Sequence, residues 1–251
     1  MNLRVLGCHG GELPKHRTTC FLIDGKLCVD GGAITAVLGL DEILQIDDIF
    51  LTHSHFDHMK DVPLMTDVLV GRRNEPVLLH GPAETMEAMD KDVFNNRVWP
   101  DFRAIPTAES PVLAFQEMPV RQPVTCQGYR IRAIPVHHPV YSVGYIFESK
   151  NGAVAFSGDT GPTDELWRVL NRTENLKALL LETSFPNKLQ KLADVSGHLT
   201  PRTLRRELSK FQRNGASILL YHLKPAFLQQ LAEELKGLPV EVLRLGDAFD
   251  L

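Results

Sequence analysis

The most informative segment of the sequence is Thr52-His53-Ser54-His55-Phe56-Asp57-His58, which directly follows the apolar run Ile49-Phe50-Leu51. Because side chains alternate along an extended strand, His53 and His55 are expected to point to the same side. If a turn and a helix begin after them, Asp57 and His58 approach a neighbouring position from another direction. Imidazole and carboxylate groups in that arrangement can hold two metal ions a few ångströms apart. The pattern therefore predicts a metal centre, and the alternative is a solvated polar loop.

Length and composition argue against a membrane-spanning or secreted protein. The chain has 251 residues, with 27 basic and 31 acidic side chains and a formal net charge of −4. A chain this long buries most of its apolar surface without cross-links. No apolar stretch approaches the roughly 20 residues of a membrane span, and the first residues lack a secretion signal. We expect a cytoplasmic protein with no membrane contact and one domain over residues 1–251. The acidic balance makes nucleic acid an unexpected partner, although a local basic patch would escape this test.

The cysteines do not suggest a thiolate metal site. Cys8, Cys20, Cys28 and Cys126 are irregularly spaced and form no C-x-x-C pair. We expect reduced thiols, mostly buried as small apolar side chains, rather than disulfides or zinc ligands.

Short apolar runs bounded by Gly, Pro, Asp or Asn recur along the chain and predict strands, and some of them are separated by segments with helical spacing. Strands are expected at residues 3–6, 21–23, 27–29, 49–52, 77–80, 112–115, 129–134, 143–147, 153–156, 178–181, 217–221 and 240–243. Helices are expected at residues 82–94, 162–170, 201–211 and 226–235, with a proline near the start of the first three and Thr200 as a cap of the third. Residues 95–111, with three prolines, are expected to form a surface loop. This order predicts an α/β (α+β) fold with two packed sheets and helices outside.

The histidine-rich stretch resembles the H-x-H-x-D-H motif of the metallo-β-lactamase superfamily. Three later segments resemble the family's other metal motifs, and each follows an expected strand: residues 137–145, 156–162 and 221–225. The resemblance implies a four-layer αββα sandwich with two divalent metal ions, zinc first and manganese or iron as alternatives.

The same resemblance implies which side chains are metal ligands. It assigns His53, His55 and His138 to one ion, Asp57, His58 and His222 to the other, and Asp159 to both. His138 is preferred to His137 because its spacing to Ser142 and to Gly144-Tyr145 resembles the phosphodiesterase and tRNA-processing branches.

Four further residues have a functional and a structural interpretation. Asp30 resembles an aspartate that orients a ligand histidine, and its alternative role is to cap a turn. His198 could contact phosphate or protonate the leaving oxygen, and its alternative is a backbone-bonded structural histidine. Lys224 could contact substrate phosphate, and its alternative is a solvated or salt-bridged surface lysine. Glu182 could support the site or simply form a hydrogen bond at the end of its strand.

The expected reaction follows from charge and from a narrower resemblance. Two dications, less two carboxylates and one bridging hydroxide, leave about one positive charge, which favours an anionic substrate. Residues 181–187, 196–201 and 222–225 resemble class II cyclic-nucleotide phosphodiesterases. That resemblance implies a hydrolase in which a metal-bridging hydroxide attacks a 3′,5′-cyclic nucleotide to give the nucleoside 5′-monophosphate. We expect Asp57 and, in the functional interpretation of its position, His198 to be the catalytic residues.

Two alternatives stay open. One is an endonuclease like ribonuclease Z that processes tRNA 3′ ends, although no Gly-rich basic insertion is found for the arm that its bacterial forms generally carry. The other, of a different class, is a non-catalytic binding protein stabilised by metal, which the complete ligand set disfavours. Analogy with superfamily relatives suggests a homodimer.

Overall fold

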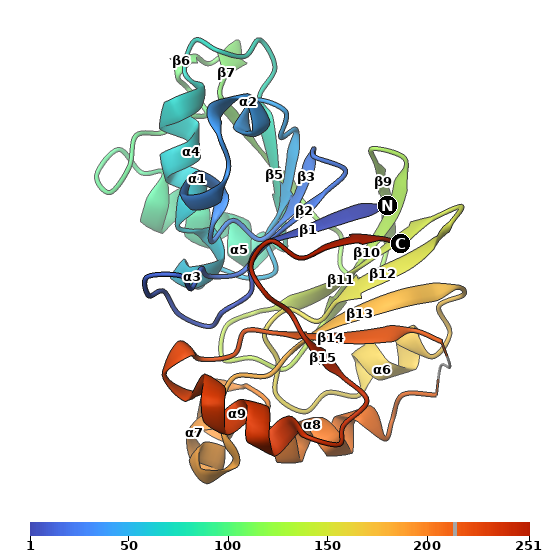
Figure 1. Ribbon diagram of the computed structural model, residues 1–251. Coiled ribbons are helices and arrows are strands. Elements are labelled where there is room, and N and C mark those ends of the chain that lie inside the picture. The colour runs from blue at the N-terminus through green and yellow to red at the C-terminus, as the bar shows by residue number, and fades with distance from the viewer. Residues whose placement is uncertain (213–214) are drawn as a thin grey trace. The chain divides into compact units, whose positions relative to one another are not determined.

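The computed structural model describes residues 1–212 and 215–251. The chain divides into two compact units, each with its own seven-stranded sheet. The first unit comprises residues 1–7, 17–118 and 245–250, and the second comprises residues 8–16, 119–244 and Leu251 (Figure 1). The single domain expected over residues 1–251 stays a prediction.

The first unit has a mixed sheet in the order β16-β1-β2-β3-β4-β5-β8. Its strands are β1 (Asn2–Gly7), β2 (Cys20–Ile23), β3 (Leu27–Val29), β4 (Asp48–Phe50), β5 (Val77–Gly81), β8 (Leu113–Glu117) and β16 (Ala248–Asp250). Neighbours from β16 to β3 are antiparallel, and those from β3 to β8 are parallel. The helices are α1 (Ile34–Val37), α2 (Leu40–Ile43), α3 (Phe56–Met59), α4 (Asp61–Leu69) and α5 (Ala83–Ala88).

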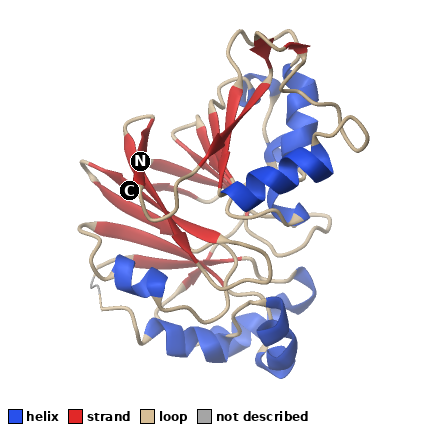
Figure 2. Ribbon diagram, turned by 180° about the vertical axis from the view of Figure 1, so that it is seen from behind, coloured by secondary structure: helices blue, strands red, loops and turns tan. Residues whose placement is uncertain are grey.

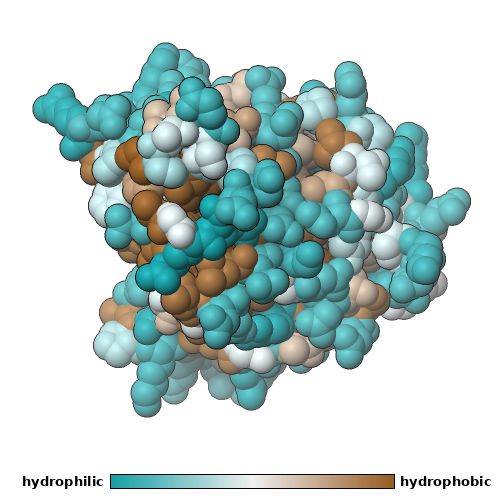
Figure 3. Space-filling model, turned by 90° about the horizontal axis from the view of Figure 1, so that it is seen from above, coloured by the Kyte–Doolittle hydropathy of each residue, from teal (hydrophilic) through white to brown (hydrophobic). Residues whose placement is uncertain are grey.

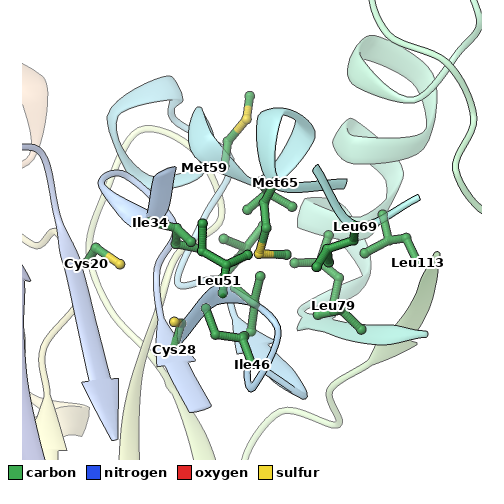
Figure 4. Close-up of a cluster of buried hydrophobic side chains, with 14 of the residues drawn as sticks. Cys20, Cys28, Ile34, Ile46, Leu51, Met59, Met65, Leu69, Leu79 and Leu113 are labelled. Carbon is green, nitrogen blue, oxygen red and sulfur yellow. The ribbon is translucent and has the colours of Figure 1, made fainter. Parts of the chain in front are cut away.

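The core of the first unit lies between its sheet and its helices. Leu51, directly after β4, and Leu79 of β5 pack in one buried cluster with Met65 and Leu69 of α4 (Figure 4). Burial of such side chains contributes about 1.5–3 kcal/mol each. This packing fixes the position of the segment that leaves β4 and enters α3.

The helix expected at residues 82–94 is not α-helical throughout. After α5 the chain forms a π-helix, Met89–Val93, in which the Phe94 amide donates to the Met89 carbonyl over five residues. The wider turn leaves Met89, Val93 and Phe94 all buried. The expected loop at 95–111 is largely confirmed, but it contains the short pair β6 (Pro106–Thr107) and β7 (Ser110–Pro111).

The second unit has its sheet in the order β15-β14-β13-β12-β11-β10-β9. Its strands are β9 (Pro123–Cys126), β10 (Tyr129–Pro135), β11 (Val143–Ser149), β12 (Gly152–Phe156), β13 (Leu176–Glu182), β14 (Ser217–Tyr221) and β15 (Glu241–Val242). Neighbours from β9 to β12 are antiparallel and those from β12 to β15 are parallel. The helices are α6 (Glu165–Leu170), α7 (Gln190–Ser196), α8 (Pro201–Leu208) and α9 (Leu228–Leu235), with 3₁₀ turns η2 (Asn187–Leu189) and η3 (Pro225–Phe227). In each unit the helices gather on one face of the sheet (Figure 2).

Helix starts in the second unit differ from the expected ones in two places. α6 begins at Glu165, not at Pro162, because the Thr163 amide donates to the Glu207 carboxylate instead of entering a helix. α9 begins at Leu228 because residues 225–227 form a 3₁₀ turn. The expected cap of α8 is confirmed, since the Thr200 side chain accepts from the Thr203 amide.

Three further features concern the helices, the cysteines and the surface. Within the part that the structure describes, no helix combines the length and the apolar character needed to cross a membrane. The four cysteines form no disulfide with one another, and Cys8, Cys20 and Cys28 are buried. Hydrophilic side chains cover most of the face in Figure 3, while apolar ones gather toward one side of it.

Candidate metal centre

The first cluster of candidate ligands lies where β4 ends. His53 and His58 are buried, and His55 and Asp57 are half-buried. The His53 ring centroid lies 4.7 Å from that of His55 and 4.3 Å from that of His58. Asp57 and His58 belong to α3, which begins immediately after His55. The first unit thus brings together the three histidines of the motif, as the strand–turn–helix argument predicts.

Asp30 orients this cluster. The Thr52 amide donates to Asp30 Oδ1 at 2.8 Å, which ends the ladder of β4 at Phe50 instead of Thr52 as expected. His58 Nδ1 lies 2.7 Å from Asp30 Oδ2. Because an ionised carboxylate only accepts hydrogen bonds, Nδ1 of His58 carries a proton, and in the neutral ring Nε2 is the nitrogen with a lone pair for a metal ion. Asp30 thus bonds a candidate ligand histidine, and the backbone amide that it accepts from lies 22 residues along the chain, so this bond is not the local turn cap of the alternative interpretation.

The second cluster lies at one edge of the second sheet. β12, β13 and β14 are parallel neighbours, so their carboxyl ends meet at the same edge. Asp159 follows β12, Glu182 ends β13 and His222 follows β14. Asp159 Oδ2 lies 3.2 Å from His222 Nε2, and both residues are buried. β10 has the same direction as β12, which brings His138 to this edge as well.

His138 has the more suitable environment of the two adjacent histidines. It is half-buried whereas His137 is exposed. Its Nδ1 lies 3.0 Å from the carbonyl oxygen of Gly197, so Nδ1 donates and Nε2 keeps its lone pair. Nitrogen or oxygen atoms of His138, Asp159 and His198 lie within 4.8 Å of one another and could hold a metal ion.

Glu182 and His198 form a buried pair beside this cluster. His198 Nδ1 lies 2.9 Å from Glu182 Oε1, and the carboxylate also accepts from the Thr160 and Leu199 amides and the Ser184 hydroxyl. Burial by itself would lower the pKa of His198, but the charge and hydrogen bond of Glu182 outweigh it and raise the pKa above its usual value. His198 therefore tends to carry a proton in this setting.

The His198 ring also has defined packing. It is nearly parallel to the His222 ring, at 5.3 Å between centroids and 19° between planes. Phe185 meets it edge-on at 5.7 Å. A histidine held by a carboxylate and two rings is preoriented, as either a catalytic or a structural role requires.

Lys224 makes a contact that the sequence does not indicate. Its ammonium donates to the Gly10 carbonyl at 2.6 Å and lies 5.6 Å from the centre of the Phe185 ring. Its expected contact with phosphate stays a prediction. Thr52, Ser184 and Gly10 are further participants that sequence analysis missed. Thr52 directly precedes the motif and could have been suspected, whereas Gly10 has no local signal.

The donor set of each cluster fits a divalent ion, since imidazole nitrogens and carboxylate oxygens accept zinc, manganese or iron. The family model described as the beta-lactamase superfamily domain matches residues 34–222. The chain belongs to this superfamily. The match includes every candidate metal ligand from His53 to His222.

Curated relatives add a narrower similarity. The chain is 26% identical over 230 residues to a Yersinia pestis protein named "Probable 3′,5′-cyclic-nucleotide phosphodiesterase", covering 80% of this chain and 63% of the relative. It is 26% identical over 245 residues to 3′,5′-cyclic-nucleotide phosphodiesterase 1 of Saccharomyces cerevisiae, covering 82% and 65%. The matches thus span less than two thirds of either relative. A shorter match, 27% over 114 residues, covers 45% of this chain and 34% of ribonuclease Z from Pyrococcus abyssi.

Solved structures establish the fold. Unliganded yeast PDE1 superposes with a TM-score of 0.85 at 21% identity, covering 100% of this chain and 99% of that one. The metallo-beta-lactamase fold protein YhfI from Bacillus subtilis gives 0.78 at 20% identity, covering 99% of each chain. The expected α/β class and metallo-β-lactamase fold are confirmed.

Proposed function

We propose that this protein is a metal-dependent phosphodiesterase that hydrolyses 3′,5′-cyclic nucleotides to nucleoside 5′-monophosphates. The observation that carries the proposal is the buried set of imidazole and carboxylate groups in each unit, with the Glu182–His198 pair beside one of them. Two relatives with cyclic-nucleotide phosphodiesterase names support the substrate class.

In this proposal seven side chains hold two divalent ions, zinc first and manganese or iron as alternatives. They are the side chains that the family resemblance assigns: His53, His55, Asp57, His58, His138, Asp159 and His222. Bound divalent metal supplies a hydroxide nucleophile near neutral pH and compensates charge on a phosphodiester.

The chain's own residues then position groups and move a proton. Asp30 keeps a proton of His58 on Nδ1, which leaves Nε2 as the ring nitrogen for a metal ion. Glu182 likewise holds the proton on Nδ1 of His198. His198 in its imidazolium form contacts a phosphate oxygen or donates the Nε2 proton to the leaving oxygen.

An apolar pocket in the first unit supports a substrate with a flat, weakly polar group beside its phosphate. It has a volume of about 360 Å³, and the residues lining it include Phe56, Met59, Leu64, Val98 and Trp99. Phe56 lies between two candidate ligands in the sequence and is 68% exposed. An exposed phenylalanine in such a pocket fits a nucleobase, which stacks on aromatic rings.

A substrate panel with Asp57→Ala tests the proposal. We expect the metal-loaded wild type to hydrolyse a bis-aryl phosphodiester and at least one 3′,5′-cyclic nucleotide. Removing the Asp57 carboxylate from the centre should lower kcat by at least about a hundredfold while circular dichroism stays unchanged. The matched control is Asp67→Ala, which removes an exposed carboxylate of the same unit and should keep full activity.

Other outcomes would assign another function. Turnover of the aryl ester with none of any cyclic nucleotide would reject the substrate. Cleavage of precursor tRNA would favour the ribonuclease Z alternative, which the shorter match supports. Metal binding without turnover of any ester would favour a binding protein. The cytoplasmic location and the homodimer stay predictions.

A further inference from the structure

His222 has a backbone conformation that needs external support. Its φ is +67°, in the left-handed region that a side chain with a Cβ rarely adopts. Such a conformation is strained and persists where neighbouring groups hold it. His222 lies directly after β14, in the second cluster described above.

The support comes from residues 8–10, a segment distant in sequence. The His222 amide donates to the Cys8 carbonyl at 2.7 Å, and the Gly10 amide donates to the Leu223 carbonyl at 3.2 Å. His9 and Leu223 form an isolated parallel bridge between these two bonds. The backbone of His222 is therefore tied on both sides to the segment 8–10.

Gly10 also meets the imidazole itself. A Cβ at Gly10 would lie 2.5 Å from the His222 carbonyl oxygen, 2.6 Å from Cδ2 and 2.8 Å from Nε2. These separations are too short for any real side chain. Gly10 is absent from the residues with positive φ in the described chain, so glycine is needed here for space rather than for conformation.

Lys224 closes the arrangement. It lies two residues after His222, and its ammonium donates to the Gly10 carbonyl at 2.6 Å. A charged donor makes this bond stronger than a neutral one. The carbonyl of Gly10 is thereby fixed while its α-carbon packs against the ring.

We propose that Gly10 and Lys224 are positioning residues that hold the His222 ring at the angle needed to bind metal. This inference rests on the proposed role of His222 as a ligand. It gives Lys224 a function through Gly10 and His222 rather than through substrate.

The first test compares Gly10→Ala with Gly11→Ala. A Cβ at Gly11 would meet only Pro225 Cδ, at 3.5 Å, which is ordinary contact, so Gly11→Ala is a matched control. Zinc affinity is measured by competition with a chromophoric chelator, and geometry by the visible spectrum of the cobalt-loaded protein. We expect Gly10→Ala to weaken affinity by about tenfold or more and to change the spectrum, as loss of an orienting partner does. Gly11→Ala should match the wild type in both.

A second comparison separates positioning from a general structural role. In a His222→Ala background the ring is gone and only the clash with the carbonyl oxygen of residue 222 remains, so adding Gly10→Ala should cause a much smaller loss of zinc affinity than in the wild type. A further loss of equal size would show that Gly10 acts elsewhere and would overturn the proposal.

Lys224→Met keeps the test decisive if Gly10→Ala does not fold. This variant removes only the amine that bonds Gly10, and we expect a several-fold loss of zinc affinity. Unchanged affinity with a raised KM for the phosphodiester would make Lys224 a substrate contact and overturn its proposed role. Unchanged affinity in both Gly10→Ala and Lys224→Met would overturn the whole inference.

These outcomes are distinguishable from failure of the proposed function. A protein that binds zinc but hydrolyses no phosphodiester would reject the function and still give a result for Gly10 and Lys224. A wild type that binds no divalent metal would reject both.

Discussion

At the scale of single residues, three histidines of the candidate site share one hydrogen-bonding arrangement. An oxygen atom lies at hydrogen-bond distance from Nδ1 of His58, His138 and His198, supplied respectively by Asp30, the Gly197 carbonyl and Glu182. Each oxygen holds a proton on Nδ1, so Nε2 is the nitrogen that can face a metal ion or a substrate. A buried neighbour of each histidine therefore determines which atom it can offer to a metal or a substrate.

His198 is the residue whose role is most open to test. We expect His198→Ala to bind metal as the wild type does, while kcat falls by about 10²- to 10⁴-fold because a proton donor is lost. Atomic absorption and steady-state kinetics measure the two effects. The exposed His137 provides the control, since His137→Ala should change neither. Loss of one metal equivalent in His198→Ala would instead make His198 a ligand.

At the scale of elements, one buried carboxylate joins two helices of the second unit. Glu207 of α8 accepts from Trp167 Nε1 at 2.7 Å and from the Thr163 amide at 3.1 Å, and Lys210 pairs with it at 2.8 Å. Glu207 is only 3% exposed. Position and burial together make it the link between α8 and the start of α6.

We therefore expect Glu207→Ala to destabilise the protein by about 2–4 kcal/mol, because it leaves a buried indole N–H and a backbone amide without their acceptor. Urea unfolding measures the change. Glu174→Ala, which removes an exposed carboxylate in the same unit, should change the free energy of unfolding by less than about 0.5 kcal/mol. An equal loss in both variants would refute the assigned role of Glu207.

Local sequence patterns predicted most of the strands, but fewer of the residues at which helices begin and end. Apolar runs such as 143–147 and 217–221 correspond closely to β11 and β14, since burial on both faces leaves a strong signal. The short helices α1 and α2 were not predicted, because four residues each give too few turns for a periodic pattern. The end of β4 and the start of α6 depend on side chains distant in sequence, Asp30 and Glu207.

In the candidate site, too, features with a local sequence signal were predicted, and features that depend on residues distant in sequence were not. Motifs placed the histidines and Asp159 at strand ends, where the structure has them, because their spacing is local. The resemblance also indicated that Asp30 orients a histidine, and its bond to His58 agrees. Gly10 could not be predicted, because its importance depends on a ring that is brought against it only by folding.

At the scale of the whole molecule, metal should contribute to stability. Ions that bind only the folded chain stabilise it by about 2.7 kcal/mol when free metal exceeds Kd a hundredfold. We expect removal of metal by a chelator to lower Tm by several degrees and zinc to restore it. Scanning calorimetry of stripped and reloaded protein measures this, with magnesium as a control because that ion prefers oxygen-only coordination. Identical Tm values for stripped and reloaded protein would contradict metal binding at these buried groups.

The pairing of β1 with β16 has a consequence for synthesis. The first unit takes an edge strand from residues 248–250. Within the second unit, residues 8–10 pair with residues 222–223. During synthesis β1 therefore emerges long before β16 exists, and the edge of β1 that β16 covers stays open to other chains. The first sheet cannot be completed before residues 248–250 are synthesised, and the second cannot be completed before β15, so each unit waits for residues far along the chain from its first strand.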